Sequence, residues 1–163
     1  MSGRTKLAGL LTLGGAMLVM AAGVAVAATV ACNGGVCRGT QEKDQITGST
    51  SRNIIFAKDG ADLVEGGPGN DDVHGGPGND LPGEGGRLDG GEGNDKVFGE
   101  AGNDSLFDGA TNDRDKLFGG RGNDLVDGVD GDNNDIVDCG PGNDFFDADP
   151  GDKVNLATCE NPF

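Results

Sequence analysis

Residues 66–74 read GGPGNDDVH, and closely related stretches follow as GGEGNDKVF at residues 90–98 and GGRGNDLVD at residues 119–127. In each stretch an aspartate is followed two positions later by an apolar residue, and this pair recurs along the chain, most often nine residues apart. The composition alone favours a disordered acidic segment, but such a segment does not hold a period, so the pattern predicts stacked repeats. The pairs are Asp44/Ile46, Asp62/Val64, Asp71/Val73, Asp95/Val97, Asp104/Leu106, Asp115/Leu117, Asp124/Val126, Asp135/Val137, Asp144/Phe146 and Asp152/Val154, with Asn53/Ile55 and Asp80/Pro82 as imperfect members.

These units resemble the G-G-x-G-x-D-x-U-x repeat of the RTX, or haemolysin-type, calcium-binding family, in which U is a large apolar residue. The resemblance covers about residues 39 to 155, and three near-perfect copies make it specific. It implies an all-β fold, a right-handed parallel β-roll (a β-solenoid) of about twelve nonapeptide half-turns. Two units make one turn, so unit n stacks on unit n+2 at a strand spacing of roughly 4.8 Å.

The residue types of the repeat suit this fold. Glycine reaches positive φ at little cost and asparagine tolerates it, which accounts for the turn that precedes each aspartate. The last three positions form a short strand, in which the U residue points inward and its neighbours face water.

The resemblance also implies calcium ligands. Calcium takes about six to eight oxygen ligands in a tolerant geometry, which paired carboxylates and loop carbonyls can supply, whereas magnesium demands a stricter octahedron. The expected carboxylate ligands are Asp62, Asp71, Asp80, Asp95, Asp104, Asp115, Asp124, Asp135 and Asp144. The expected stacked pairs are Asp62 with Asp80, Asp71 with Asp95, Asp80 with Asp104, Asp95 with Asp115, Asp104 with Asp124, Asp115 with Asp135, and Asp124 with Asp144. The loop glycines assigned to the same sites are Gly67, Gly69, Gly76, Gly78, Gly91, Gly93, Gly102, Gly120, Gly122 and Gly142. Several calcium ions per chain are therefore expected.

The pattern breaks in four places. Asn53 replaces the ligand aspartate, and the first two units lack the second glycine, so they are expected to cap the roll. Pro82 is expected at an inward strand position, followed by six surplus residues, 84–89, that bulge outward. Residues 108–113 and 129–134 are interpreted as smaller bulges, and each insertion puts the neighbouring metal pair in doubt.

The N-terminus has the features of an export signal. Arg4 and Lys6 precede an apolar run that ends in a small-x-small site, which predicts cleavage before Ala28. A membrane anchor and a lipoprotein modified on Cys32 are the alternatives. The predicted organisation is a signal peptide at 1–27, a linker with degenerate capping repeats at 28–56, calcium-binding repeats at 57–147, and a C-terminal cap at 148–163.

Export to an oxidising compartment predicts disulfides among Cys32, Cys37, Cys139 and Cys159. Zinc is the weaker interpretation, because the pairs lack the usual spacing. In a roll of about six turns the ends lie roughly 25 to 30 Å apart, too far for a disulfide. Cys32–Cys37 and Cys139–Cys159 are therefore the expected pairs.

The formal charge of −16 disfavours contact with nucleic acid or anionic lipid and attracts cations. The single histidine, His74, falls at an outward position, and the carboxylates do not converge as a catalytic pair, so no enzyme activity is expected. We expect a secreted or envelope-associated structural or interaction module with no membrane span after cleavage. A calcium-dependent adhesin or envelope factor and a disordered calcium buffer are the alternatives. No protein or polysaccharide partner is indicated.

Overall fold

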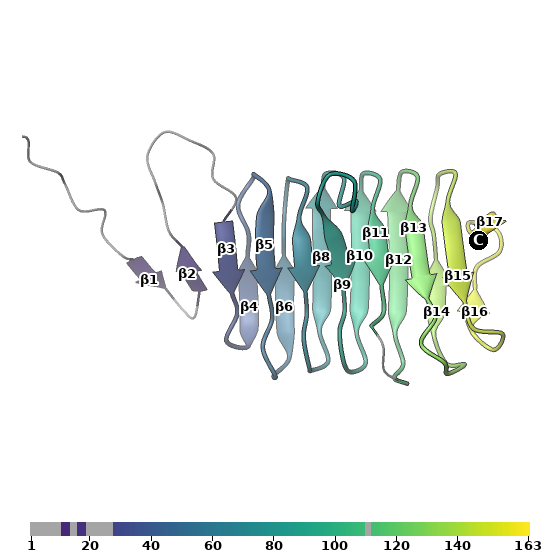
Figure 1. Ribbon diagram of the computed structural model, residues 1–163, viewed down its shortest axis with the longest axis horizontal. Coiled ribbons are helices and arrows are strands. Elements are labelled where there is room, and N and C mark those ends of the chain that lie inside the picture. The colour runs from purple at the N-terminus through teal and green to yellow at the C-terminus, as the bar shows by residue number, and fades with distance from the viewer. Residues whose placement is uncertain (1–10, 14–15, 19–27, 110–111) are drawn as a thin grey trace, which may run out of the picture.

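The computed structural model describes residues 11–13, 16–18, 28–109 and 112–163. From Ala28 onward the strands form a parallel β-solenoid of two facing sheets, and they follow one another along its long axis from β3 to β17 (Figure 1). The all-β roll is thus confirmed, with about seven turns. The strands are β3 (Ala28–Ala31), β4 (Gly35–Arg38), β5 (Asp44–Thr47), β6 (Asn53–Phe56), β7 (Leu63–Glu65), β8 (Asp72–Pro77), β9 (Arg87–Asp89), β10 (Lys96–Ala101), β11 (Ser105–Phe107), β12 (Lys116–Arg121), β13 (Leu125–Gly128), β14 (Ile136–Asp138), β15 (Phe145–Ala148), β16 (Lys153–Val154) and β17 (Asn161–Pro162).

Odd-numbered strands from β3 to β17 form a sheet of eight, and even-numbered strands from β4 to β16 form a sheet of seven. Successive strands therefore alternate between the sheets, as expected for half-turn units. The roll begins before the first repeat, because β3 pairs with β5 and β4 pairs with β6.

Two further strands lie in the segment that the sequence predicts to be a signal peptide. β1 (Leu11–Leu13) and β2 (Ala16–Leu18) pair antiparallel. The rest of residues 1–27, including the cleavage motif, lies outside the described residues. No helix long and apolar enough to cross a bilayer occurs in the part of the chain that the structure describes.

The core is a column of apolar side chains between the two sheets. Each repeat contributes the residue two positions after its aspartate, and in-register pairing stacks like on like, as in Val73 beside Val97 and Leu106 beside Val126. The predicted inward positions are thereby confirmed for these residues, which are fully buried. The column consists of Ile46, Ile55, Val64, Val73, Leu88, Val97, Leu106, Leu117, Val126 and Val137, with Val30, Cys37 and Phe146 at its ends.

One expectation is wrong at the longest insertion. Pro82 lies exposed in a turn, and Leu88 of β9 is buried at the inward position instead. In the parallel register Arg87 pairs with Leu63 and Leu88 pairs with Val64, and a proline in the place of Leu88 would have no N–H to donate to the ladder. The surplus residues are therefore 81–86 and not 84–89.

A row of stacked rings crosses the outer face of the seven-stranded sheet. Phe56, His74, Phe98 and Phe118 occupy the same position in successive turns, with ring centroids 4.8, 4.8 and 5.0 Å apart. His74 therefore faces outward, as predicted, and packs between two phenylalanine rings. Such a ladder favours one register, since a slip would turn every ring to the other face.

Both predicted disulfides are present at the ends of the roll. Cys32 and Cys37 join the end of β3 to β4 with their Cα atoms 5.9 Å apart, and Cys139 and Cys159 join the segment after β14 to the C-terminal segment at 5.0 Å. Each cross-link secures a terminal turn, which has neighbours on one side only.

Glycine is required where neighbouring loops touch. A Cβ on Gly102, whose φ is +149°, would lie 1.2 Å from the carbonyl oxygen of Gly78. Gly102→Ala is therefore expected to destabilise the roll by about 3 kcal/mol or more. Thermal unfolding in saturating calcium measures the loss. Gly83→Ala is the control, because a Cβ at Gly83 meets no atom within 4 Å. Equal melting temperatures for the two variants would contradict the close stacking of the loops.

Candidate metal centre

The repeat aspartates form two rows along the roll. The first row precedes the strands of the eight-stranded sheet and consists of Asp44, Asp62, Asp80, Asp104, Asp124 and Asp144. The second row precedes the strands of the seven-stranded sheet and consists of Asn53, Asp71, Asp95, Asp115, Asp135 and Asp152. Every member of a row is buried or half-buried.

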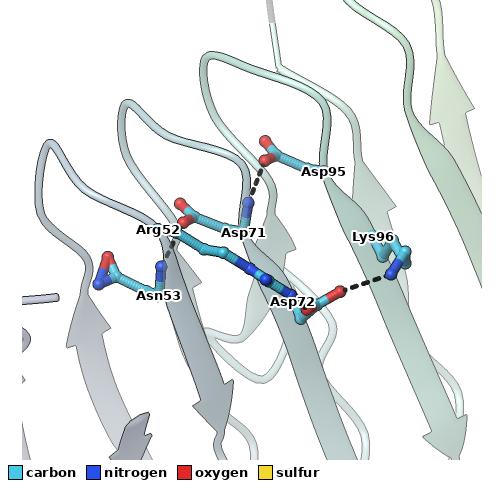
Figure 2. A network of polar contacts seen from close by, with 6 residues as sticks. All are labelled: Arg52, Asn53, Asp71, Asp72, Asp95 and Lys96. Atoms are coloured by element: carbon cyan, nitrogen blue, oxygen red, sulfur yellow. Dashed lines mark hydrogen bonds and ion pairs between the residues drawn. The ribbon is translucent and has the colours of Figure 1, made fainter. Parts of the chain in front are cut away.

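One hydrogen bond repeats along each row. The backbone N–H of each member donates to the Oδ1 atom of the next, as from Asp71 to Asp95 at 2.6 Å and from Asp104 to Asp124 at 2.9 Å. Figure 2 shows this contact for three members of the second row, Asn53, Asp71 and Asp95. All seven predicted n/n+2 pairs are neighbours in this way.

The insertions do not interrupt either row. Asp71 and Asp95 are 24 residues apart in sequence, against 18 for Asn53 and Asp71, yet both contacts measure 2.6 Å. The extra residues are accommodated in loops, and the parallel register is kept on both sides.

The second carboxylate oxygen of most row members has no partner. Oδ2 is buried without a hydrogen bond in Asp62, Asp71, Asp95, Asp104, Asp124, Asp135 and Asp144. It points into its own loop, where a Cβ on the first glycine would approach it, at 2.6 Å for Gly119 and Asp124. A buried oxygen that is left unsatisfied costs about 1–3 kcal/mol, more when it is charged. The rows therefore present a series of oxygens that lack a partner within the described protein.

The first two repeat units, which contain Asp44 and Asn53, differ from the later ones. Both the backbone N–H and the Oγ1 hydroxyl of Thr40 donate to Asp44 Oδ2. In the next unit the N–H of Ser49 donates to Asn53 Oδ1 at 2.8 Å. A residue with a hydroxyl thus stands where later units have the second glycine, and the loop satisfies its own oxygen. In these two units Asp44 Oδ2 and Asn53 Oδ1 already have hydrogen-bond partners, so neither oxygen requires a cation.

Burial perturbs the carboxyl groups of the rows. Desolvation, reinforced by neighbouring carboxylates, raises the pKa of Asp95 and Asp104 to about 8 and that of Asp62 to about 7. The pKa of Asp115 is likewise raised to about 7. Burial raises the pKa to about 6 for Asp71, Asp80, Asp124 and Asp135. Packing two rows of carboxylates into the roll is therefore unfavourable at neutral pH unless positive charge accompanies them.

An outward aspartate provides the contrast. Asp72 lies between Arg52 and Lys96 on the outer face (Figure 2). Although burial acts in the opposite direction, hydrogen bonds from these two side chains lower the pKa of Asp72. Basic side chains thus neutralise the outer face, while the rows have only carboxylates and backbone groups.

The predicted loop glycines stack in columns beside the rows. A Cβ on Gly93 would lie 1.7 Å from the carbonyl oxygen of Gly69, and one on Gly122 would lie 1.6 Å from that of Gly102. The carbonyls of one loop therefore face the next loop at the same position. The other predicted glycines, Gly67, Gly76, Gly78, Gly91, Gly120 and Gly142, occupy equivalent places.

This donor set suits a hard cation. The unpartnered Oδ2 atoms and the loop carbonyls are all oxygens, which calcium prefers, and the rows contain no imidazole or thiolate for a softer metal. The repeat aspartates and the glycine carbonyls of adjacent loops are the groups that would hold calcium, whose charge would offset that of the rows.

The sequence interpretation did not assign a site to Asp108 and Asp130. Both lie in stretches interpreted as bulges, yet the structure brings their carboxylates close to Asp135. One sequence feature distinguishes Asp108 from an ordinary loop residue. Asp108 and the glycine after it stand where other units begin with two glycines.

Comparison with known proteins agrees with this geometry. The family model for the RTX calcium-binding nonapeptide repeat matches residues 39–82, 86–114 and 110–135, which is more than half of the chain. The break between the first two matches falls at the loop of residues 81–86. No curated protein and no solved structure matches the chain. The chain therefore belongs to the RTX calcium-binding nonapeptide repeat family.

Proposed function

We propose that this protein is an extracellular calcium-binding module whose roll forms when calcium binds between its stacked loops. The observation that carries the proposal is the repeated, buried and unpartnered Oδ2 of the row aspartates. Each such oxygen is a cost to the folded chain, and a calcium ion bridging two loops would remove it at many places at once. Because binding is restricted to the folded form, its free energy contributes directly to folding.

Several features support a location outside the cell. Two disulfides secure the ends of the roll, and disulfides persist in oxidising compartments. The apolar N-terminal segment has the features of an export signal. Calcium sites of extracellular modules bind with Kd values of about 10⁻⁴ to 10⁻³ M, so sites of this kind would fill only where calcium is plentiful.

The role is structural rather than catalytic. The row carboxylates are distributed along two edges of the roll at one strand spacing, which is the arrangement of a scaffold and not of a catalytic pair in a cleft. A calcium-dependent adhesin or envelope factor is one form that such a module could take.

The calcium sites are expected to be unequal. Asp124 has an unpartnered Oδ2 and stacks between Asp104 and Asp144, whereas donors from Thr40 already satisfy Asp44 Oδ2. Asp124→Ala should therefore lose at least one bound calcium ion, and Asp44→Ala should lose none. Isothermal titration with calcium to millimolar levels measures both. The proposal fails if the unmodified protein binds no calcium in this range, and equal losses would show that the capping unit is a working site.

A further inference from the structure

Three aspartates converge where the two units that contain the stretches 108–113 and 129–134 stack, in each of which the repeat aspartates are 11 residues apart. They are Asp108 after β11, Asp130 in the loop after β13, and Asp135 of the second row, and one carboxylate oxygen from each lies within 4.8 Å of the others. The nonapeptide pattern places one aspartate in each loop, so two of these three carboxylates come from outside it. Their convergence follows from the insertions of both units, which lie on the same edge of the roll.

Asp108 is buried and unsatisfied. Its residue is 2% exposed, and its Oδ2 atom has no hydrogen-bond partner. Asp135 is fully buried, and its Oδ2 atom also lacks a partner. Two carboxyl groups of separate loops, each with a buried and unpartnered oxygen, therefore lie together with a third carboxylate. Without a cation this arrangement is costly, because like charges at such distances repel and cannot be solvated.

The surrounding chain accommodates these side chains. Asp108 occupies the loop position that is Gly66 and Gly90 in the two preceding units of the same edge, and Gly128 follows at that position in the next turn. A Cβ on Gly128 would lie 3.7 Å from Asp108 Oδ2. Asp130 is held in place, since its oxygens accept hydrogen bonds from the N–H groups of Asp132 and Asp113.

We propose that Asp108, Asp130 and Asp135 form a separate three-carboxylate calcium site that fills before the nonapeptide sites. The choice of ion rests on the proposed calcium function, and the site itself rests on the convergence and burial of the three side chains. Affinity for calcium rises with the number of charged ligands and with the rigidity of the site. Three carboxylates here replace the two that a stacked pair supplies.

A neighbouring triplet is less suited to the same role. Asp132, Asp135 and Asp152 also bring carboxylate oxygens within 4.8 Å. Asp132 already accepts two hydrogen bonds from Asn134. Asp152 accepts bonds from the N–H groups of Asp135 and Asp149. All four carboxylate oxygens of Asp132 and Asp152 thus have partners, whereas in the first triplet only Asp130 is satisfied in this way and Asp108 Oδ2 has no partner.

The test compares bound calcium at two concentrations. Asp108→Asn and Asp130→Asn are the variants, singly and together, and Asp127→Asn is the control because it removes the same charge beside the triplet, on β13, without belonging to it. Purified protein is dialysed to equilibrium at about 10⁻⁵ M calcium, in the range of sensor sites, and again at millimolar calcium, and bound metal is measured by atomic emission.

At the lower concentration we expect one ion per chain in the unmodified protein and in the control. Each single variant should lose that ion, and the double variant should lose no more, because both side chains belong to one site. Retention of the ion by Asp108→Asn, or separate losses that add in the double variant, would overturn the proposal. If the unmodified protein bound no calcium even at millimolar levels, the proposed function itself would fail.

Two further variants test the site even if the amide substitution at Asp108 prevents folding. Asp108→Gly restores the residue found at this position in neighbouring units and should fold in saturating calcium while lacking the early site. Asp130 is only half-buried in a loop, so its amide variant tests the site even if substitutions at Asp108 impair folding. A folded Asp108→Gly or Asp130→Asn protein that keeps the early ion would equally reject the site.

Discussion

In a calcium-free buffer at neutral pH, the chain without residues 1–27 is expected to lose its β-roll, and millimolar calcium should restore it. The reason lies in the two rows, whose members are stacked at one strand spacing and in seven of which Oδ2 is buried without a partner. The core that opposes this repulsion is thin, because each strand contributes one inward side chain. Loss of Arg4 and Lys6 changes the formal charge from −16 to −18, which adds a further cost to the compact state. Far-ultraviolet circular dichroism in chelator, followed by a calcium titration, measures the change.

Magnesium provides the control for this experiment. It demands a near-ideal octahedron and gives up its waters reluctantly, so it should restore little of the β spectrum at equal concentration. The two disulfides stay oxidised in both buffers. Each one constrains only a terminal segment, so the disulfides alone should not maintain the roll. A complete β spectrum in chelator would mean that the roll is stable without metal and that the ions serve another purpose.

The roll and its rows could be predicted from the sequence because one period determines both. An aspartate followed two places later by an apolar residue puts one side chain in the turn and the other in the core, so the same count gives the fold and the stacked pairs. The pair Asp71 and Asp95 was predicted correctly across a long insertion for this reason. Counting from one repeat aspartate to the next still identifies the stacked pairs when extra residues intervene, because the loops accommodate those residues.

Counting could not locate the insertion within its unit. Pro82 was expected inward because it follows Asp80 at the usual distance, but Leu88 occupies that position. The inward residue needs both an N–H for the ladder and an apolar side chain for the core, and Leu88 in β9 has both, whereas Pro82 has no N–H. Which residue takes the inward position depends on its pairing with the neighbouring strand. The spacing of residues along the sequence carries no information about that pairing.

Two other features also depend on three-dimensional packing. Strands β3 and β4 lack the glycine pattern, yet they extend both sheets through backbone pairing with β5 and β6. Asp108 and Asp130 lie in stretches that read as turn-rich bulges, and their convergence on Asp135 follows from the stacking of two insertions on one edge. Neither feature has a periodic signal.

Acid is expected to substitute for calcium in folding the roll. Burial raises the pKa of eight row carboxyls, those of Asp62, Asp71, Asp80, Asp95, Asp104, Asp115, Asp124 and Asp135, from 3.8 to between about 6 and about 8. The folded chain therefore binds protons at these groups more tightly than the unfolded chain. Their contribution to stability is therefore complete below about pH 4 and is lost as the pH rises through about 6 to 8. In chelator, lowering the pH from about 8 to about 5 should induce the β spectrum, with a midpoint inside that interval. Circular dichroism at low protein concentration follows the transition.

The position of the midpoint separates this effect from simple loss of net charge. Asp95→Asn together with Asp104→Asn removes two of the carboxyls with the highest pKa, and an amide is already accommodated in the second row at Asn53. This variant should fold at a higher pH than the unmodified chain. Glu42→Gln with Glu92→Gln changes the net charge equally at exposed positions and should leave the midpoint in place. If both double variants shift it alike, general repulsion controls folding. If only the row variant does, protons and calcium ions stabilise the roll for the same reason, which is that both remove negative charge from buried oxygens that the protein leaves unpaired.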